Sequence, residues 1–193
     1  MPLLSHPPGS VEPVAVADAR VACRIDGLDL DGELAGLISA AREQAEHITG
    51  RYWRLQVQRL EPADWPAGRE LLLDLPSASA VAISYRSAAT PEDWTALASD
   101  QIRWGALGHQ TSIRLRAAVA AWPELADATE WPDRLRVDVT VGPADVASVP
   151  ASVQRYILAS VAGWLDQSAA LADGRLQANP LFERLLDRER LWH

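Results

Sequence analysis

The chain has 193 residues and a net charge of -8, and all 18 of its basic residues are arginine. This length is enough for one domain with a sizeable core. Proteins that hold nucleic acid on a basic surface need clustered Lys and Arg, so the charge excludes that class. An acidic surface is nevertheless compatible with a channel through which DNA slides without sticking.

Cys23 is the single cysteine, which excludes a disulfide framework and a cysteine-based metal cage. The N-terminal residues lack the basic and apolar regions of a signal peptide. No apolar run approaches the ~20 residues of a membrane helix. We therefore expect a soluble protein, made in a reducing compartment and without membrane contact.

Helical patterns dominate the first part of the chain. Residues 1–13 carry four prolines and predict a flexible arm. A short helix is expected over 14–25. A longer helix follows and ends at Gly50, with one apolar stripe made of Leu34, Leu37, Ile38, Ala41, Ala45 and Ile48.

After Gly50 the period changes to that of strands. Short alternating segments separated by Pro, Gly, Asp and Ser predict an antiparallel sheet or small barrel. The expected strands are 52–60, 70–75, 80–86, 101–104, 112–116 and 134–141, and residues 117–133 are expected to form a long ordered loop.

A helical pattern returns at Pro150 and runs to about residue 167, and a short last helix is expected at about 180–190. The predicted fold is therefore α+β: a helical scaffold with two N-terminal helices, a long helix near 150–167 and a short C-terminal helix, interrupted by an antiparallel β-rich region. We expect a single domain over 14–193, with the β-rich insertion at about 52–141.

The crossing from strand to helix at residues 135–167 superficially resembles a phosphate-binding loop. Such a loop needs several glycines and usually a lysine. The segment "VGPADVASVP" has one glycine, no lysine and an acidic Asp145. Pro150 is better explained as the first residue of a helix. The segment is therefore interpreted as structural.

The sequence contains no recognisable catalytic or metal-binding motif. The isolated histidines His6, His47, His109 and His193 lack the spacing of metal ligands. Cys23 has no evident base beside it, and the acids after Asp26 do not match a calcium loop. We expect no catalytic residue, cofactor or metal site, and a protein that is not an enzyme.

Eight tryptophans stand out, and several lie in loops before prolines. Tryptophan is enriched where proteins bind partners, although loop tryptophans also wedge loops onto a sheet. The candidate subunit or partner contacts are Trp122, Trp131, Phe182, Leu186 and Trp192.

Three segments resemble the head–tail connector (head-completion adaptor) proteins of tailed bacteriophages and prophages, in the branch with a β-rich insertion. Residues 12–51 resemble the opening pair of helices and end in the Thr49-Gly50-Arg51 signature, preceded by Glu46. Residues 71–86 resemble a strand–proline–strand step. Residues 137–167 resemble the last strand and long helix, except that Pro143 and Ala144 replace a second glycine and an aromatic residue.

This resemblance implies a structural protein of the virion, made in the cytoplasm of a bacterial host and placed at the head–tail junction. Copies would form a homo-oligomeric ring matching the portal protein, extend the DNA channel without sequence-specific binding, and dock a tail or stopper protein. Two other classes stay open: a carbohydrate- or cell-wall-binding module using the loop tryptophans, and a small hydrolase that would need two paired carboxylates.

Overall fold

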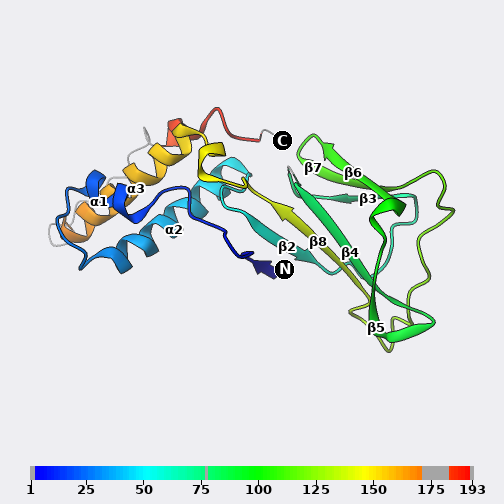
Figure 1. Ribbon diagram of the computed structural model, residues 1–193. Helices are drawn as coiled ribbons and strands as arrows, with labels where there is room; N and C mark the ends of the chain where they lie inside the picture. Colours follow the sequence, from blue (N-terminus) through cyan, green and yellow to red (C-terminus); the bar gives the residue numbers. More distant parts are fainter. Residues whose placement is uncertain (1–2, 77, 171–182, 192–193) are drawn as a thin grey trace. The chain divides into compact units, whose positions relative to one another are not determined.

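The computed structural model describes residues 3–76, 78–170 and 183–191, and the chain divides into two compact units (Figure 1). The helical unit comprises Gly9–Arg54 and Pro143–His193, and the β unit comprises Met1–Pro8 and Leu55–Gly142. Helices and antiparallel sheets thus occupy separate parts of the sequence. The predicted α+β fold is confirmed. The expected organisation as a single domain with an insertion at about 52–141 stays a prediction.

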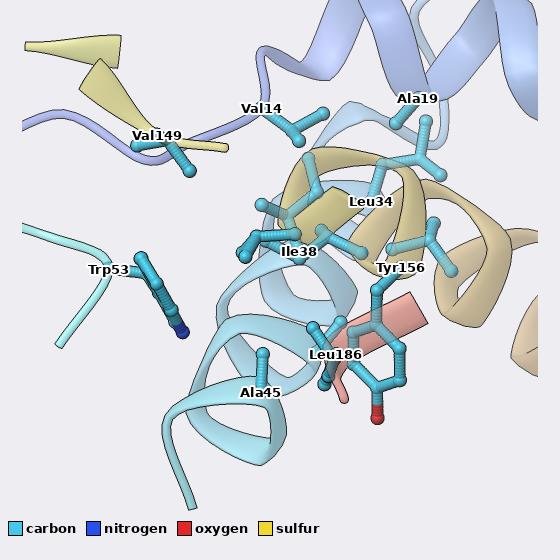
Figure 2. Close-up of a cluster of buried hydrophobic side chains, with 13 residues drawn as sticks. Val14, Ala19, Leu34, Ile38, Ala45, Trp53, Val149, Tyr156 and Leu186 are labelled. Atoms are coloured by element: carbon cyan, nitrogen blue, oxygen red, sulfur yellow. The ribbon is translucent and has the colours of Figure 1, made fainter. Parts of the chain in front are cut away.

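Three helices build the helical unit: α1 (Val16–Cys23), α2 (Asp31–Thr49) and α3 (Ala151–Ala170), followed by the short 3-10 helix η4 (Arg184–Leu186). Their apolar faces pack together into one core, seen in Figure 2. The core is formed by Val14, Ala19, Leu34, Ile38, Ala41, Ala45, Trp53, Val149, Val153, Tyr156, Ile157, Val161 and Leu186. The apolar stripe predicted for residues 34–48 therefore packs against apolar side chains of α3 inside this unit.

Helix α2 ends where its glycine predicts. Gly50 has a φ of 68°, in the left-handed region, and its N–H donates to the carbonyl of Glu46 at 2.9 Å. Glycine occupies this conformation without the steric cost that a Cβ atom brings. A Cβ at this position would make an ordinary van der Waals contact with Leu191, 3.6 Å from its Cβ, so the backbone conformation and not a lack of space favours glycine.

Two antiparallel sheets form the β unit. The five-stranded sheet has the order β1-β2-β8-β4-β5, and the three-stranded sheet has the order β3-β7-β6. The strands are β1 (Leu3–Ser5), β2 (Gln56–Leu60), β3 (Glu70–Leu73), β4 (Ala80–Ser87), β5 (Thr90–Ala96), β6 (Ile102–Leu107), β7 (Gln110–Leu115) and β8 (Leu135–Val141). The segment 117–133 is a loop, as predicted, with one isolated bridge between Ser87 and Leu125.

Each sheet buries one face. Strand β8 is the centre of the larger sheet, and Leu135, Val137, Val139 and Val141 are fully buried while the residues between them are not. In the smaller sheet Ile113 of β7 is fully buried and Arg114 is exposed. This alternation with a period of two fixes the register, because a slip by one residue would turn the apolar side chains to solvent.

The structure differs from the sequence interpretation at three places. Residues 3–5 of the expected flexible arm form β1, which pairs with β2, so this part of the arm belongs to a sheet. Strand β5 was not among the expected strands; as the edge strand of its sheet it tolerates Pro91. In the expected C-terminal helix at 180–190, the described part holds only the short helix η4, and residues 180–182 lie outside the described residues.

We expect Gly50→Ala to lower the free energy of unfolding by about 1–2 kcal/mol, because alanine pays a steric cost in the left-handed region. The matched control is Gly36→Ala in the middle of α2, where a Cβ meets nothing within 4 Å. This control should stabilise the helix by up to ~1 kcal/mol. Urea unfolding followed by far-ultraviolet circular dichroism measures the free energy of unfolding of both variants. Equal effects of the two substitutions would contradict the left-handed conformation assigned to Gly50.

Candidate functional site

A buried arginine organises the N-terminal half of the helical unit. The side chain of Arg42 on α2 is 2% exposed, and it forms ion pairs with Glu12 at 2.9 Å and with Glu46 at 2.8 Å. Its remaining nitrogen donates to the Ser39 hydroxyl and pairs with Glu43. A buried guanidinium is costly unless its donors are all used, and here each of its nitrogens has an acceptor.

The two main partners of Arg42 each hold a further segment. Glu46 accepts a hydrogen bond from the backbone N–H of Trp53 at 2.8 Å, and Glu12 accepts one from Arg54 at 2.7 Å. Burial raises the pKa of Glu46, and the hydrogen bonds from Trp53 and Arg42 only partly oppose that rise. Burial lowers the pKa of Arg42, but the neighbouring carboxylates of Glu46 and Glu12 outweigh it and raise the pKa.

The Thr49-Gly50-Arg51 segment joins the end of α2 to the C-terminal part of the chain. The hydroxyl of Thr49 donates to the carbonyl of Ala45 and accepts the indole N–H of Trp53 at 3.0 Å. The Thr49 carbonyl accepts the N–H of Leu191 at 2.8 Å. Arg51 donates to the carbonyl of Glu189 at 2.8 Å. In this chain the segment therefore holds the C-terminal residues 189–191 against the end of α2 within the helical unit.

Loop tryptophans of the β unit contact one another. The rings of Trp65 and Trp122 stack with centroids 4.6 Å apart and planes 11° from parallel. Each indole N–H donates to a backbone carbonyl, that of Pro123 for Trp65 and that of Gly68 for Trp122. These contacts hold the long loop 117–133 against the loop between β2 and β3, which contains Trp65 and Gly68.

A second aromatic group surrounds Arg86 on β4. Its guanidinium lies 4.5 Å from the ring centroids of both Trp94 and Trp131, and Arg136 lies 3.8 Å from that of Trp94. Asp133 pairs with both arginines, at 3.2 Å and 3.5 Å. Cation–π contacts and ion pairs therefore hold the end of the loop against the larger sheet.

The structure places the candidate contact residues in different settings. Trp122 and Trp131 are half-buried in the contacts just described, and Leu186 is fully buried in the core of the helical unit. Phe182 and Trp192 lie outside the described residues. Trp122 and Trp131 belong to the β unit and Leu186 to the helical unit, and the role of the five residues in partner contacts stays a prediction.

The crossing from β8 to α3 has the geometry of a capped connection. Gly142 has a φ of 89°, and Asp145 accepts hydrogen bonds from the backbone and the hydroxyl of Ser148, capping the 3-10 helix η2 (Val146–Ser148). The hydrogen bonds from Ser148 lower the pKa of Asp145. The carboxylate that would repel a phosphate is therefore used to shape the loop.

Within the described residues, no group of three or more His, Cys, Asp or Glu side chains is arranged to hold a metal ion. Burial, with a smaller contribution from Asp166, raises the pKa of the Cys23 thiol, which keeps the thiol protonated. No helix in the described part of the chain is long and apolar enough to cross a membrane.

Several apolar residues are exposed at positions that the hydrophobic periodicity of the sequence did not indicate. A groove of about 540 Å³ runs between α1 and α3, bordered by Val21, Arg155 and Leu158. Val21 is 80% exposed and Leu28, in the loop after α1, is 65% exposed. In the β unit Leu72, Trp104 and Leu107 are exposed on the smaller sheet. Exposed apolar patches of this kind are typical of surfaces that contact another protein.

Comparison with known proteins gives matches in solved structures only. No protein-family model matches the chain, and no curated protein matches it significantly. A chain in the neck of an empty GTA particle, determined with C6 symmetry, shares the fold with a TM-score of 0.71 and 19% identity, covering 99% of this chain and 96% of that one.

Two further structures agree with this match. A chain in the virion of a native gene transfer agent (GTA) particle has a TM-score of 0.70 at 21% identity, and one in the neck of a native GTA particle, determined with C12 symmetry, has 0.68 at 21%. Both cover 99% of this chain and 96% of the other. The likeness therefore includes the helical unit and the β unit.

We expect Arg42→Met to lower the free energy of unfolding by about 3–5 kcal/mol, because it leaves Glu12 and Glu46 partly buried without their cation. The control is Glu43→Gln, which removes the exposed partner of the same arginine and should change stability by less than ~1 kcal/mol. Urea unfolding measures both. Similar losses for the two variants would show that burial of the network does not matter.

We expect Asp133→Asn to destabilise the protein more at pH 7 than at pH 3. The hydrogen bond from Arg86 holds the pKa of Asp133 below its ordinary value. Its stabilising contribution is therefore present above the unfolded-state pKa of ~3.9 and is lost as the pH falls through the lower folded-state value.

Urea unfolding of Asp133→Asn and of the parent protein at both pH values measures this difference. Glu92→Gln on the exposed edge of β5 is the matched control. A difference between variant and parent that stays constant with pH would contradict the assignment.

Proposed function

We propose that this chain is a structural subunit of the neck of a phage-like particle, where a ring of copies joins the portal to the tail or stopper protein. The observation that carries the proposal is the match over 99% of this chain and 96% of a neck chain, which includes both units. The three segments that resemble head–tail connectors support the same role, because they are distributed along most of the chain.

Cyclic assembly places a specific requirement on each subunit, and the exposed surface of this chain is compatible with it. Contacts in a ring are head-to-tail, so each subunit needs two different complementary patches. Exposed apolar residues occur in both units, and they include Val21, Leu28 and Leu30 in the helical unit and Leu72 and Leu107 in the β unit. The neck structures that share the fold were determined with cyclic symmetry.

The charge is consistent with a channel for DNA. With a net charge of -8, the chain is negative overall, which in this role lets DNA pass without being held. In this role the protein is a part of the virion at the head–tail junction and carries out no catalysis.

A carbohydrate-binding role for the loop tryptophans has less support. Sugar-binding tryptophans present an open ring face, whereas Trp65 and Trp122 stack on each other and Trp94 and Trp131 contact Arg86. These rings are already used to hold the loops of the β unit.

Light scattering on the purified chain, alone and mixed with a portal protein encoded upstream in the same genome, tests the proposal. We expect a ring-sized mass in at least one of the two samples, because the portal provides a template for weak contacts between copies. A persistent monomer that does not bind the portal would overturn the neck role. Quenching of tryptophan fluorescence by a cell-wall polysaccharide would then support the carbohydrate-binding alternative.

A further inference from the structure

The outer face of the three-stranded sheet is an unusual surface for a protein of this charge. Cross-strand partners share a face, so the register places Glu70, Arg114 and Arg103 in one row across β3, β7 and β6. The opposite face carries the fully buried Ile113. Arg103 and Arg114 of this row are exposed, so their charges are accessible to a partner.

The next row along the same face is small and apolar. It contains Leu72, Ser112 and Gly105, and Leu107 lies one row further on β6. A hollow of about 220 Å³ opens here, lined by residues 103–107 of β6 together with Ser112 and Arg114 of β7. A Cβ atom built on Gly105 would meet nothing within 4 Å, so the absence of a side chain leaves this hollow open.

The charges beside the hollow are only partly neutralised. Arg114 pairs with Glu70 at 2.8 Å, and the Ser112 hydroxyl donates to the same carboxylate at 2.6 Å. Arg103 is exposed and forms no ion pair with any described residue. The surface thus has a net positive charge beside two leucines, Leu72 and Leu107, that are 48% and 51% exposed.

A loop in the helical unit has the complementary properties. Residues 26–30, between α1 and α2, read Asp-Gly-Leu-Asp-Leu and are all exposed. Leu28 and Leu30 are 65% and 38% exposed, although the exposure of an apolar side chain to water is unfavourable. Asp26 and Asp29 form no ion pair within the described residues. We call residues 26–30 the acidic–leucine loop.

We propose that the acidic–leucine loop of one copy docks on the outer face of the three-stranded sheet of the next copy. Leu28 enters the hollow over Gly105, and Asp29 pairs with Arg103. This inference rests on the proposed ring and names the contact that builds it. The two patches are different and complementary, which is the arrangement that head-to-tail contact in a ring requires.

Charge complementarity selects a second copy as the occupant. The loop provides carboxylates next to leucines, and the sheet face provides arginines beside leucines, so the two patches have opposite charges and both are partly apolar. Burying the four leucines also removes apolar surface that each copy otherwise exposes to water.

Disulfide cross-linking between copies that carry a single cysteine at different positions tests the contact. In a Cys23→Ser background, one full-length sample carries Leu28→Cys and the other carries Gly105→Cys. We expect a disulfide between positions 28 and 105 when the samples are mixed, with or without the portal protein. The matched control pairs Leu28→Cys with Glu92→Cys on the exposed edge of the larger sheet and should give little product.

Charge reversal provides the second readout. Arg103→Glu in the copy that carries Gly105→Cys should reduce the yield of the cross-link about tenfold, since an attraction becomes a repulsion. Asp29→Arg in the other copy should restore it. Gly105→Gln in an otherwise unmodified chain should fill the hollow and weaken assembly, while the circular dichroism spectrum and the stability stay those of the parent protein.

The outcomes separate this inference from the proposed function. The expected cross-link, lost with Arg103→Glu and rescued by Asp29→Arg, supports the contact. A ring that forms without this cross-link, or that tolerates Gly105→Gln, overturns the contact and leaves the neck role in place. The absence of both a ring and a cross-link, alone and with the portal, overturns both.

Discussion

The helical unit depends on one buried ionic cluster, in which Arg42 bridges Glu12 and Glu46. These three residues connect the segment before α1, the middle of α2 and the turn after α2, because Arg42 pairs with both carboxylates and Glu46 also accepts the N–H of Trp53. Such clusters stabilise a fold less than apolar packing of the same volume does, but they are severely disrupted when one member is removed. Arg42 thus specifies which segments meet, and the surrounding apolar side chains supply most of the stability.

In the β unit, arginine has a different role: it helps to hold the long loop 117–133 against the sheet. Its long loop 117–133 has no sheet partner beyond an isolated bridge, so side chains must hold it. Arg86 and Trp131 at one end, and Trp65 and Trp122 at the other, do so through ring contacts. Guanidinium groups suit this use because they are planar, stay charged and lie flat on aromatic rings.

The sequence predicted the elements whose residues repeat with a clear period. The stripes of α2 and α3, the alternation of β8 and the stop at Gly50 all follow from local rules. The burial of Arg42 was not predicted, because a charged residue beside an apolar stripe is normally solvated; its spacing of four from Glu46 was the available signal. The pairing of Arg86 with Trp131 joins residues far apart in the chain, which no local pattern can indicate.

The division of the chain also sets the order in which the protein folds during synthesis. The β unit lies almost wholly between residues 55 and 142, so most of its strands leave the ribosome together. The helical unit needs α3 and Leu186, which arrive last, to cover the apolar face of α2. At about 5–20 residues per second, α2 waits several seconds with that face uncovered. The nascent chain is therefore most open to aggregation, and to help from chaperones, before α3 and Leu186 have been made.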